Sequence, residues 1–400
     1  MKNLLGVILI LGILLSFSLV TLAAEEITVW AMGAEAQKIG EMVASFEEKY
    51  PDIGVTVQAI PWSNAHDKLI TAIAGGTGPD VAQLGTTWMA EFAPIGVFAE
   101  LSRYLEHSTL ISREQFFSGS YATNVVDGHL FGIPWYVDTR VLFYRTDLVA
   151  EIGYHHPPKN WEQLREIAGQ LAQKGEYGLA LSTNNYQEFL PFVWQNGGRI
   201  FDQNGKIAVT EPAFVEALEF YVQLFKDGVA PLDAQGTDLF QEFAAGRMPM
   251  YFSGPWMINL TREQVPEIDG KWSVALMPEK KTRTSFIGGC NLVIFNSSKQ
   301  KEAAWKFVEF MGEAKNQLTW YKISGSLPTN RHTWEEPYFD DLAMVKVFGR
   351  QLEDAKAPLN IPQWAQIEYL LQQRLQEACY GKKSPLEAME ALAQDIEGIM

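Results

Sequence analysis

The sequence predicts an α/β protein built from two domains. Apolar and amphipathic segments alternate over residues 27–84 in the order strand, helix, strand, helix, strand. Such units form a parallel sheet with right-handed crossovers. The chain has 400 residues, which exceeds what one hydrophobic core usually supports. A second apolar body follows from about residue 132, as expected for a second domain.

The first elements are expected in this order. A strand over residues 27–31 is followed by a helix that ends at the turn over 50–52. Strands over 55–60 and 81–84 flank a second helix over 63–74. The apolar residues at helical spacing are Ile39, Met42, Val43 and Phe46 in the first helix, and Leu69, Ile70 and Ile73 in the second.

The second apolar body contains its own signals for where strands and helices begin. Residues 132–149 hold a strand and a possible crossing between the domains. Asn160 and Thr210 are each expected to cap a helix. Residues 250–256 are predicted to be a strand that leads into a helix with a proline near its start. Residues 384–387 form a capping box that begins the last helix.

The N-terminus predicts export. Residues 1–23 contain one basic residue, Lys2, then a long apolar stretch and small residues, which is typical of a secretory signal peptide. The alternative is an uncleaved membrane anchor. No cysteine follows the expected cleavage site, so a lipid anchor is not expected. The mature protein is therefore expected in the periplasm or outside the cell.

Composition excludes several classes of function. The net charge is −16 and no basic stripe is present, so nucleic acid is not an expected partner. No His or Cys cluster has metal-ligand spacing, and we expect neither a metal nor a cofactor. Cys290 and Cys379 are expected as two buried free thiols, with a disulfide as the alternative.

The twelve tryptophans divide into two groups. Trp161, Trp305 and Trp320 fall at helical positions and are expected in the core. A second group lies where strands end or loops begin, and consists of Trp30, Trp62, Trp88, Trp135, Trp256 and Trp364. Exposed indole rings are costly for solubility unless a ligand covers them.

Three of these tryptophans are expected at one edge of the first sheet. Trp30, Trp62 and Trp88 lie at or just past the ends of the first three strands, and ligands bind beyond the carboxyl ends of parallel strands. The hydrogen-bonding residues near them are Ser63, Asn64, Asp67, Thr86, Thr87 and Glu91. Aromatic faces beside polar groups suit a sugar, which has apolar faces and hydroxyl rims. The alternative is that each ring fills a gap between helix and sheet.

The second body offers further contacts. Around the possible crossing lie Trp135, Tyr136, Asp138 and Arg140. A later segment rich in amides and aromatics adds Asn184, Asn185, Tyr186, Glu188, Trp194 and Asn196. These residues could meet the opposite face of the same ligand.

Taken together, several motifs resemble a known family. They are ITVWAMGAEAQKIGEMVASFEEKYPDIGVTV, GGTGPDVAQL, AAGRMPMYFSGPW, KQKEAAWKFVEFM, SGSLPTNR and GKKSPLEAM. Their succession resembles the family 1 extracellular solute-binding proteins, the group that includes maltose-binding protein. The resemblance implies a two-lobe periplasmic-binding-protein fold of the type II kind. Each lobe would be a mostly parallel sheet flanked by helices, and three segments would cross between the lobes. It also implies a monomer that delivers a carbohydrate to the membrane subunits of an ABC transporter.

The resemblance also sets the lobes. The first would comprise residues 24–140 and 287–327, and the second residues 141–286 and 328–400. The resemblance also implies which positions contact the ligand. They are Trp30 to Gly33 (which includes Met32), Trp62 to Asn64, Thr86 to Glu91, Gly254 to Trp256, Gly288, Gly289, Asn291 and Trp364. The family often has an acidic residue beside the tryptophan after strand three. Here Thr86-Thr87-Trp88 departs from that pattern, so Glu91 or Asp67 would substitute.

Two other functions remain open from the sequence. A secreted glycosidase needs a pair of carboxylates, which Glu91, Asp138 and Glu188 could supply. A polyamine or another small polar solute is the second alternative. We expect a binding protein rather than an enzyme, and the number of tryptophans favours a di- or oligosaccharide over a monosaccharide.

Overall fold

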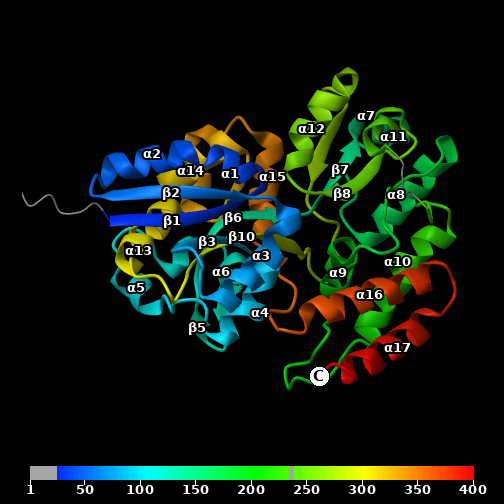
Figure 1. The fold of residues 1–400 in the computed structure, drawn as a ribbon. Coiled ribbons are helices and arrows are strands. Elements are labelled where there is room, and N and C mark those ends of the chain that lie inside the picture. Colours follow the sequence, from blue (N-terminus) through cyan, green and yellow to red (C-terminus); the bar gives the residue numbers. More distant parts are fainter. Residues whose placement is uncertain (1–24, 234–237) are drawn as a thin grey trace, which may run out of the picture.

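The computed structural model describes residues 25–233 and 238–400, and it shows two α/β lobes (Figure 1). The predicted signal peptide therefore lies outside the described residues. Within the described chain, no helix has the length and apolar character to cross a membrane. The two-lobe α/β fold predicted from the sequence is confirmed.

The main sheet of the first lobe has the strand order β11-β6-β10-β3-β1-β2. Its strands are β1 (Glu25–Met32), β2 (Ile53–Ile60), β3 (Val81–Gly85), β6 (Gly132–Thr139), β10 (Ser285–Ile294) and β11 (Leu327–Pro328), and β12 (Ala355–Lys356) pairs with β10. A separate hairpin joins β4 (Val125–Val126) and β5 (His129–Leu130). The helices are α1 (Gly33–Lys38), α2 (Gly40–Lys49), α3 (Trp62–Gly75), α4 (Met89–Phe92), α5 (Ser102–His107), α6 (Ser118–Ala122), α13 (Lys301–Gly312) and α14 (Ala314–Ser324).

Strand directions fix which edge of this sheet faces the second lobe. β1 runs parallel to β2 and to β3, whereas β10 runs antiparallel to both β3 and β6. The carboxyl ends of β1, β2, β3 and β6 therefore share one edge. At that edge β6 ends at Thr139 and the next strand begins at Val141 in the other sheet, so only Arg140 separates the two sheets along the chain.

The second lobe differs from the prediction in its sheet. Its strands are β7 (Val141–Arg145), β8 (Met250–Ser253) and β9 (Trp272–Ala275), in the order β8-β7-β9. β7 pairs antiparallel with both neighbours, so the prediction of a mostly parallel sheet in each lobe is wrong for this one. The reason is that β7 pairs with segments more than 100 residues away, which local periodicity does not reveal.

The remaining helices belong to the second lobe, except that α15 (Ala343–Leu352) also contacts the first sheet (Figure 1). They are α7 (Thr146–Glu151), α8 (Trp161–Lys174), α9 (Tyr186–Gln195), α10 (Pro212–Lys226), α11 (Leu239–Ala244), α12 (Trp256–Gln264), α15 (Ala343–Leu352), α16 (Trp364–Cys379) and α17 (Pro385–Glu397). The predicted cap at Asn160 is confirmed, because its side chain accepts from the Gln163 amide, and so is the Ser384 capping box. The cap predicted at Thr210 is wrong by one residue, since Glu211 precedes α10.

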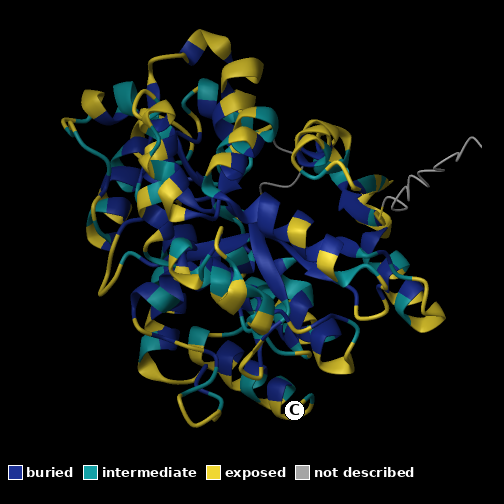
Figure 2. Ribbon diagram, turned by 90° about the vertical axis from the view of Figure 1, so that its left-hand side faces the viewer, coloured by how far each residue is buried: buried dark blue, intermediate teal, exposed yellow. Residues whose placement is uncertain are grey.

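Figure 2 shows buried strands at the centre and exposed residues on the outer faces of the helices. The core positions predicted for Trp161, Trp305 and Trp320 are confirmed, because all three are buried. Ile70, predicted to face inward, is 45% exposed. The two cysteines are free and buried, as expected, and burial raises the pKa of each thiol to about 12.

Candidate ligand-binding site

The facing edges of both sheets meet at the crossing. The carboxyl edge of the first sheet leads through Arg140 into β7, as described above. In the second sheet Ser253, the last residue of β8, pairs with Val141, the first residue of β7. The N-terminus of α12, which starts at Trp256, therefore lies at the same crossing.

On the first lobe, Trp62 and Trp88 form an aromatic pair. Their ring centroids are 5.7 Å apart in an edge-to-face arrangement, and Trp62 is 39% exposed. The indole of Trp62 packs against Gly33, where an added Cβ would lie 2.4 Å from Trp62 Cδ1. Gly33 also has a φ of +59°. Glycine is therefore required after the first strand, both by the backbone and by the ring that covers it.

Three of the other strand-end tryptophans are not exposed. Trp30 is 5% exposed, and its ring lies 4.7 Å from the ammonium of Lys68 on α3. Trp135 is buried and stacks on Trp320, and Trp364 is buried with its ring 5.6 Å from that of Tyr186. The expectation that these three rings are exposed for a ligand is wrong, because each side chain points to a face of its element that a helix or a core covers.

Polar groups predicted beside Trp62 and Trp88 lie on α3 and the segment after β3. Asn64 and Asp67 are exposed on α3, and Thr87 is half-buried. Glu91 Oε2 lies 2.8 Å from Nε2 of His66, and that imidazole is 5.2 Å from the Trp88 ring. The sequence analysis missed His66, because no local pattern shows that it lies against Glu91 and Trp88.

At the base of this sheet edge, the buried side chain of Gln83 connects β1 to β6 through hydrogen bonds. Gln83 Oε1 accepts from the Met32 amide at 2.7 Å, and Gln83 Nε2 donates to the Tyr136 hydroxyl at 3.1 Å. Met32 is fully buried, so its contribution is the backbone, not the side chain. Burial raises the pKa of Tyr136 well above its ordinary value, and burial also raises the pKa of Glu35, which hydrogen-bonds to Tyr136. The phenol therefore stays protonated and can donate.

The crossing itself carries an ion pair and an indole. Arg140 Nη1 donates to Asp138 Oδ1 at 2.9 Å, and Nη2 donates to Gln187 Oε1 on α9. The same guanidinium lies 4.9 Å from the ring of Trp256 and 5.4 Å from that of Phe286. Trp256 is 44% exposed. Gln187 was not among the predicted residues, because a lone glutamine carries no sequence signal.

The returning strand β10 contributes backbone rather than side chains. A Cβ at Gly288 would lie 3.0 Å from Asp138 Oδ1, and one at Gly289 would lie 2.3 Å from the Tyr136 carbonyl oxygen. Asn291 is fully buried, and it accepts from Asn124 at 2.9 Å within the first lobe. Its predicted role as a ligand contact is therefore not compatible with its position.

The N-terminus of α9 supplies the polar groups of the second lobe. Asn185 caps the helix and donates to Glu188 Oε1 at 3.1 Å, and the Ser182 amide donates to Glu188 Oε2 at 2.9 Å. Burial raises the pKa of Glu188 to about 7. Trp194, further along α9, is half-buried against the lobe's core.

Glu368 on α16 is a carboxylate that the sequence analysis missed. Burial raises the pKa of Glu368. Burial, and after it the charge of Glu368, raises the pKa of nearby Tyr186 to about 12. The ring of Tyr186 lies 5.9 Å from that of Phe286 on β10, so Glu368 belongs to the same region of the second lobe.

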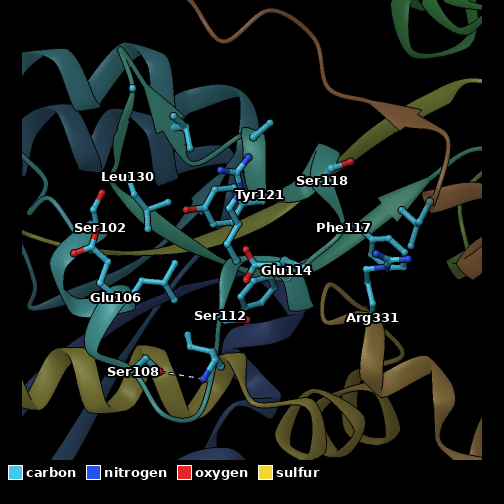
Figure 3. Close-up of a pocket in the computed structure, with 18 of the residues that line it drawn as sticks. Ser102, Glu106, Ser108, Ser112, Glu114, Phe117, Ser118, Tyr121, Leu130 and Arg331 are labelled. Carbon is cyan, nitrogen blue, oxygen red and sulfur yellow. Dashed lines mark hydrogen bonds between the residues drawn. The ribbon is translucent and has the colours of Figure 1, made fainter.

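A hollow of about 1060 Å³ lies between residues 102–130 of the first lobe and later residues that include Arg331 and Glu353 (Figure 3). Ser102, Glu106, Glu114, Tyr121 and Arg331 are among the residues that line it, and the predicted site residues are not. The candidate site is therefore defined by the two facing sheet edges and not by this hollow.

Two lobes that carry aromatic and polar groups on their facing sheet edges are the arrangement of a protein that binds a small molecule between its lobes. The family model described as bacterial extracellular solute-binding protein matches residues 30–318. The chain belongs to this family.

Individual relatives agree with that assignment. The structure of the sugar-binding protein MalE from Xanthomonas citri is 35% identical with a TM-score of 0.90, and covers 94% of this chain and 97% of that one. A solute-binding protein of Thermotoga lettingae bound with α-D-tagatose is 28% identical with a TM-score of 0.77, covering 94% and 99%. The galactooligosaccharide-binding protein of Bacillus subtilis is 25% identical over 93% of this chain and 89% of its own length.

Proposed function

We propose that this protein captures a di- or oligosaccharide between its lobes and delivers it to the membrane subunits of an ABC transporter. The observation that carries the proposal is the pair of half-exposed indoles, Trp62 and Trp256, one on each facing edge. Sugars offer C–H faces to such rings and hydroxyls to charged groups beside them. The sugar-binding relatives described above support the same ligand class.

The polar contacts divide between the lobes. Asp67 and Glu91 on the first lobe, Asp138 and Arg140 at the crossing, and Asn185 on the second would take hydroxyls. A carboxylate offers about four acceptor positions and a guanidinium five donors, so one pair can hold several hydroxyls. Because Arg140 already contacts Trp256, the crossing places its charges beside the ring that would stack on the sugar.

Capture would proceed by closure of the lobes. The open form exposes each half-site to water, and a sugar that contacts both halves stabilises the closed form. We place the lobe boundaries at the crossing after residue 140, at the return near residue 287 and at the exit near residue 327. The single residue between β6 and β7 supports the first boundary.

We also propose that the protein does not turn over its ligand and acts as a secreted monomer. Two of the three carboxylates that could serve a hydrolase are engaged, Glu91 with His66 and Asp138 with Arg140. Chromatography of an oligosaccharide after long incubation checks the first point, since any shortened product would contradict it. Light scattering of the mature protein checks the second.

A thermal-shift screen tests the main proposal. The mature protein is mixed with a panel of monosaccharides, disaccharides and oligosaccharides, with spermidine as the representative polyamine. A ligand that binds the native state raises the melting temperature by mass action. Hits are followed by isothermal titration calorimetry. A panel in which only spermidine stabilises the protein would overturn the carbohydrate assignment.

A further inference from the structure

Gln83 is a fully buried polar residue that connects β3 to three other strands of the first sheet. Its Oε1 accepts from the Met32 amide at 2.7 Å, and its Nε2 donates to the Tyr136 hydroxyl at 3.1 Å and to Cys290 Sγ at 3.4 Å. Replacing both partners of a buried hydrogen bond by apolar groups of the same shape can leave stability nearly unchanged. The buried amide therefore points to a directional role.

The backbone fixes which way this amide points. The Met32 N–H can only donate, so the side-chain oxygen of Gln83 must face it and the NH2 group must face Tyr136. The NH2 group can also only donate, so the phenol oxygen is its acceptor. The single proton of the Tyr136 hydroxyl is therefore directed away from Gln83 and toward another acceptor.

Two acceptors contact this hydroxyl, Glu35 and Cys290. Burial raises the pKa of the Cys290 thiol to about 12, so the sulfur keeps its proton and is a weak acceptor. A carboxylate is a much stronger acceptor. Burial raises the pKa of Glu35, and hydrogen bonds from its own amide and from Tyr136 oppose that rise. The phenol proton therefore goes to the Glu35 carboxylate.

This carboxylate lies beside the exposed indole of the first lobe. A Cβ added to Gly33 would lie 3.5 Å from Glu35 Oε2 and 2.4 Å from Trp62 Cδ1, so the carboxylate and the ring flank the same glycine. Glu35 was not among the predicted site residues, because only folding brings it beside Trp62 and Tyr136.

We infer that Gln83 and Tyr136 are positioning residues of the binding site: Gln83 sets the direction of the phenol, and the phenol holds the Glu35 carboxylate beside Trp62 as an acceptor for a ligand hydroxyl. A carboxylate has about four acceptor positions, so the bond from Tyr136 leaves others for the ligand. The inference rests on the proposed function. It adds that residues behind the ligand-contacting surface contribute to affinity without touching the ligand.

The test measures affinity by isothermal titration calorimetry and stability by melting temperature. The probe is the saccharide of the thermal-shift screen that binds wild type most tightly, with maltotriose and galactotriose included in the panel. Tyr136→Phe removes the phenol hydroxyl, and it is made in wild type and in a Glu35→Ala background. Gln83→Met combined with Tyr136→Phe removes both groups, so that the amide is not left unpaired. Tyr251→Phe is the matched control, because its buried hydroxyl contacts Thr261 in the second lobe.

In wild type, Tyr136→Phe should weaken binding about three- to tenfold, the range that one hydrogen bond contributes. In the Glu35→Ala background the same change should alter affinity by less than about twofold, because the residue through which it acts is gone. Its effect on melting temperature should be equal in both backgrounds, which separates positioning from a merely structural role. The double variant with Gln83→Met should bind like Tyr136→Phe alone, and Tyr251→Phe should bind like wild type.

Different failures have different meanings. If Tyr136→Phe binds like wild type, or weakens binding equally in both backgrounds, the phenol does not act through Glu35, and the inference fails while the proposed function stands. If the double variant binds more weakly than Tyr136→Phe, Gln83 does not act through the phenol. If wild type binds no saccharide of the panel, the proposed function fails and the inference fails with it.

Discussion

The guanidinium of Arg140 lies 4.9 Å from the centre of the Trp256 ring. The two residues belong to different elements, the crossing between β6 and β7 and the first turn of α12. A cation at this distance from an indole is attracted by the ring and also fixes its orientation. The exposed face of Trp256 is thereby preorganised by the residue that connects the two sheets.

Trp256→Ala should weaken saccharide binding by about 1–3 kcal/mol, because a large aromatic contact with the ligand is lost. Calorimetry with the best saccharide from the screen measures it. Tyr338→Ala is a matched control, since Tyr338 has the same exposed fraction, 44%, and lies in the short helix after α14. Equal affinity of wild type and Trp256→Ala would remove this indole from the site.

Arg140→Ala should lower the free energy of unfolding by about 1–3 kcal/mol, because Asp138 would keep a partly buried charge without its partner. Asp138→Asn combined with Arg140→Ala should restore part of that loss, since the unpaired charge is then gone. Urea unfolding of the single and double variants measures both changes. If the double variant is less stable than Arg140→Ala, the loss in the single variant does not come from the unpaired charge of Asp138.

Gly289→Ala should destabilise the protein by about 1–3 kcal/mol. Its φ is +119°, a region that L side chains rarely adopt, and the new Cβ would lie 2.3 Å from the Tyr136 carbonyl oxygen. Gly54→Ala is the control, because it lies in β2 with open space around it. Thermal unfolding compares them, and equal melting temperatures for the two variants would contradict the argument.

Glu188 should make stability depend on pH. Its pKa is raised from 4.5 to about 7 by burial, so between these values the unfolded chain has lost a proton that the folded chain keeps. Stability therefore falls as pH rises from about 4.5 to 7 and is unaffected by this group outside that interval. Relative to wild type, Glu188→Gln should gain up to about 3 kcal/mol between pH 4.5 and pH 8. Urea unfolding at both pH values measures it, and a constant difference would refute it.

The sequence predicted the first lobe well because its signals are local. Strand ends at Ala31, Ile60 and Leu84 follow from runs of apolar residues and the turns after them, and the structure places β1, β2 and β3 within two residues of these predictions. The aromatic edge was predicted in part. Trp62, the first residue of α3, is exposed, whereas Trp30, two residues before the end of β1, is buried with Lys68 of α3 over its ring.

The second lobe depended on contacts that no local pattern encodes. The antiparallel partners of β7 come from residues 250–253 and 272–275, and Asn291 is buried because distant Thr123 and Asn124 bind its amide. His66, Gln187 and Glu368 were missed for the same reason. Their meaning comes only from the residues that folding brings beside them.

The two native thiols should not react in the folded protein, since both are buried and their pKa values are raised to about 12. A thiol-reactive chromophore should label no cysteine of the native protein and two per chain in urea. Rapid labelling under native conditions would show that one of them is accessible.

Because the two native thiols do not react in the folded protein, the chain is also suitable for engineering. One cysteine introduced beside Trp256 would be the sole attachment point for an environment-sensitive dye. A dye there would report ligand arrival as a change in emission, so the protein could serve as a reagentless optical sensor without first removing any native residue.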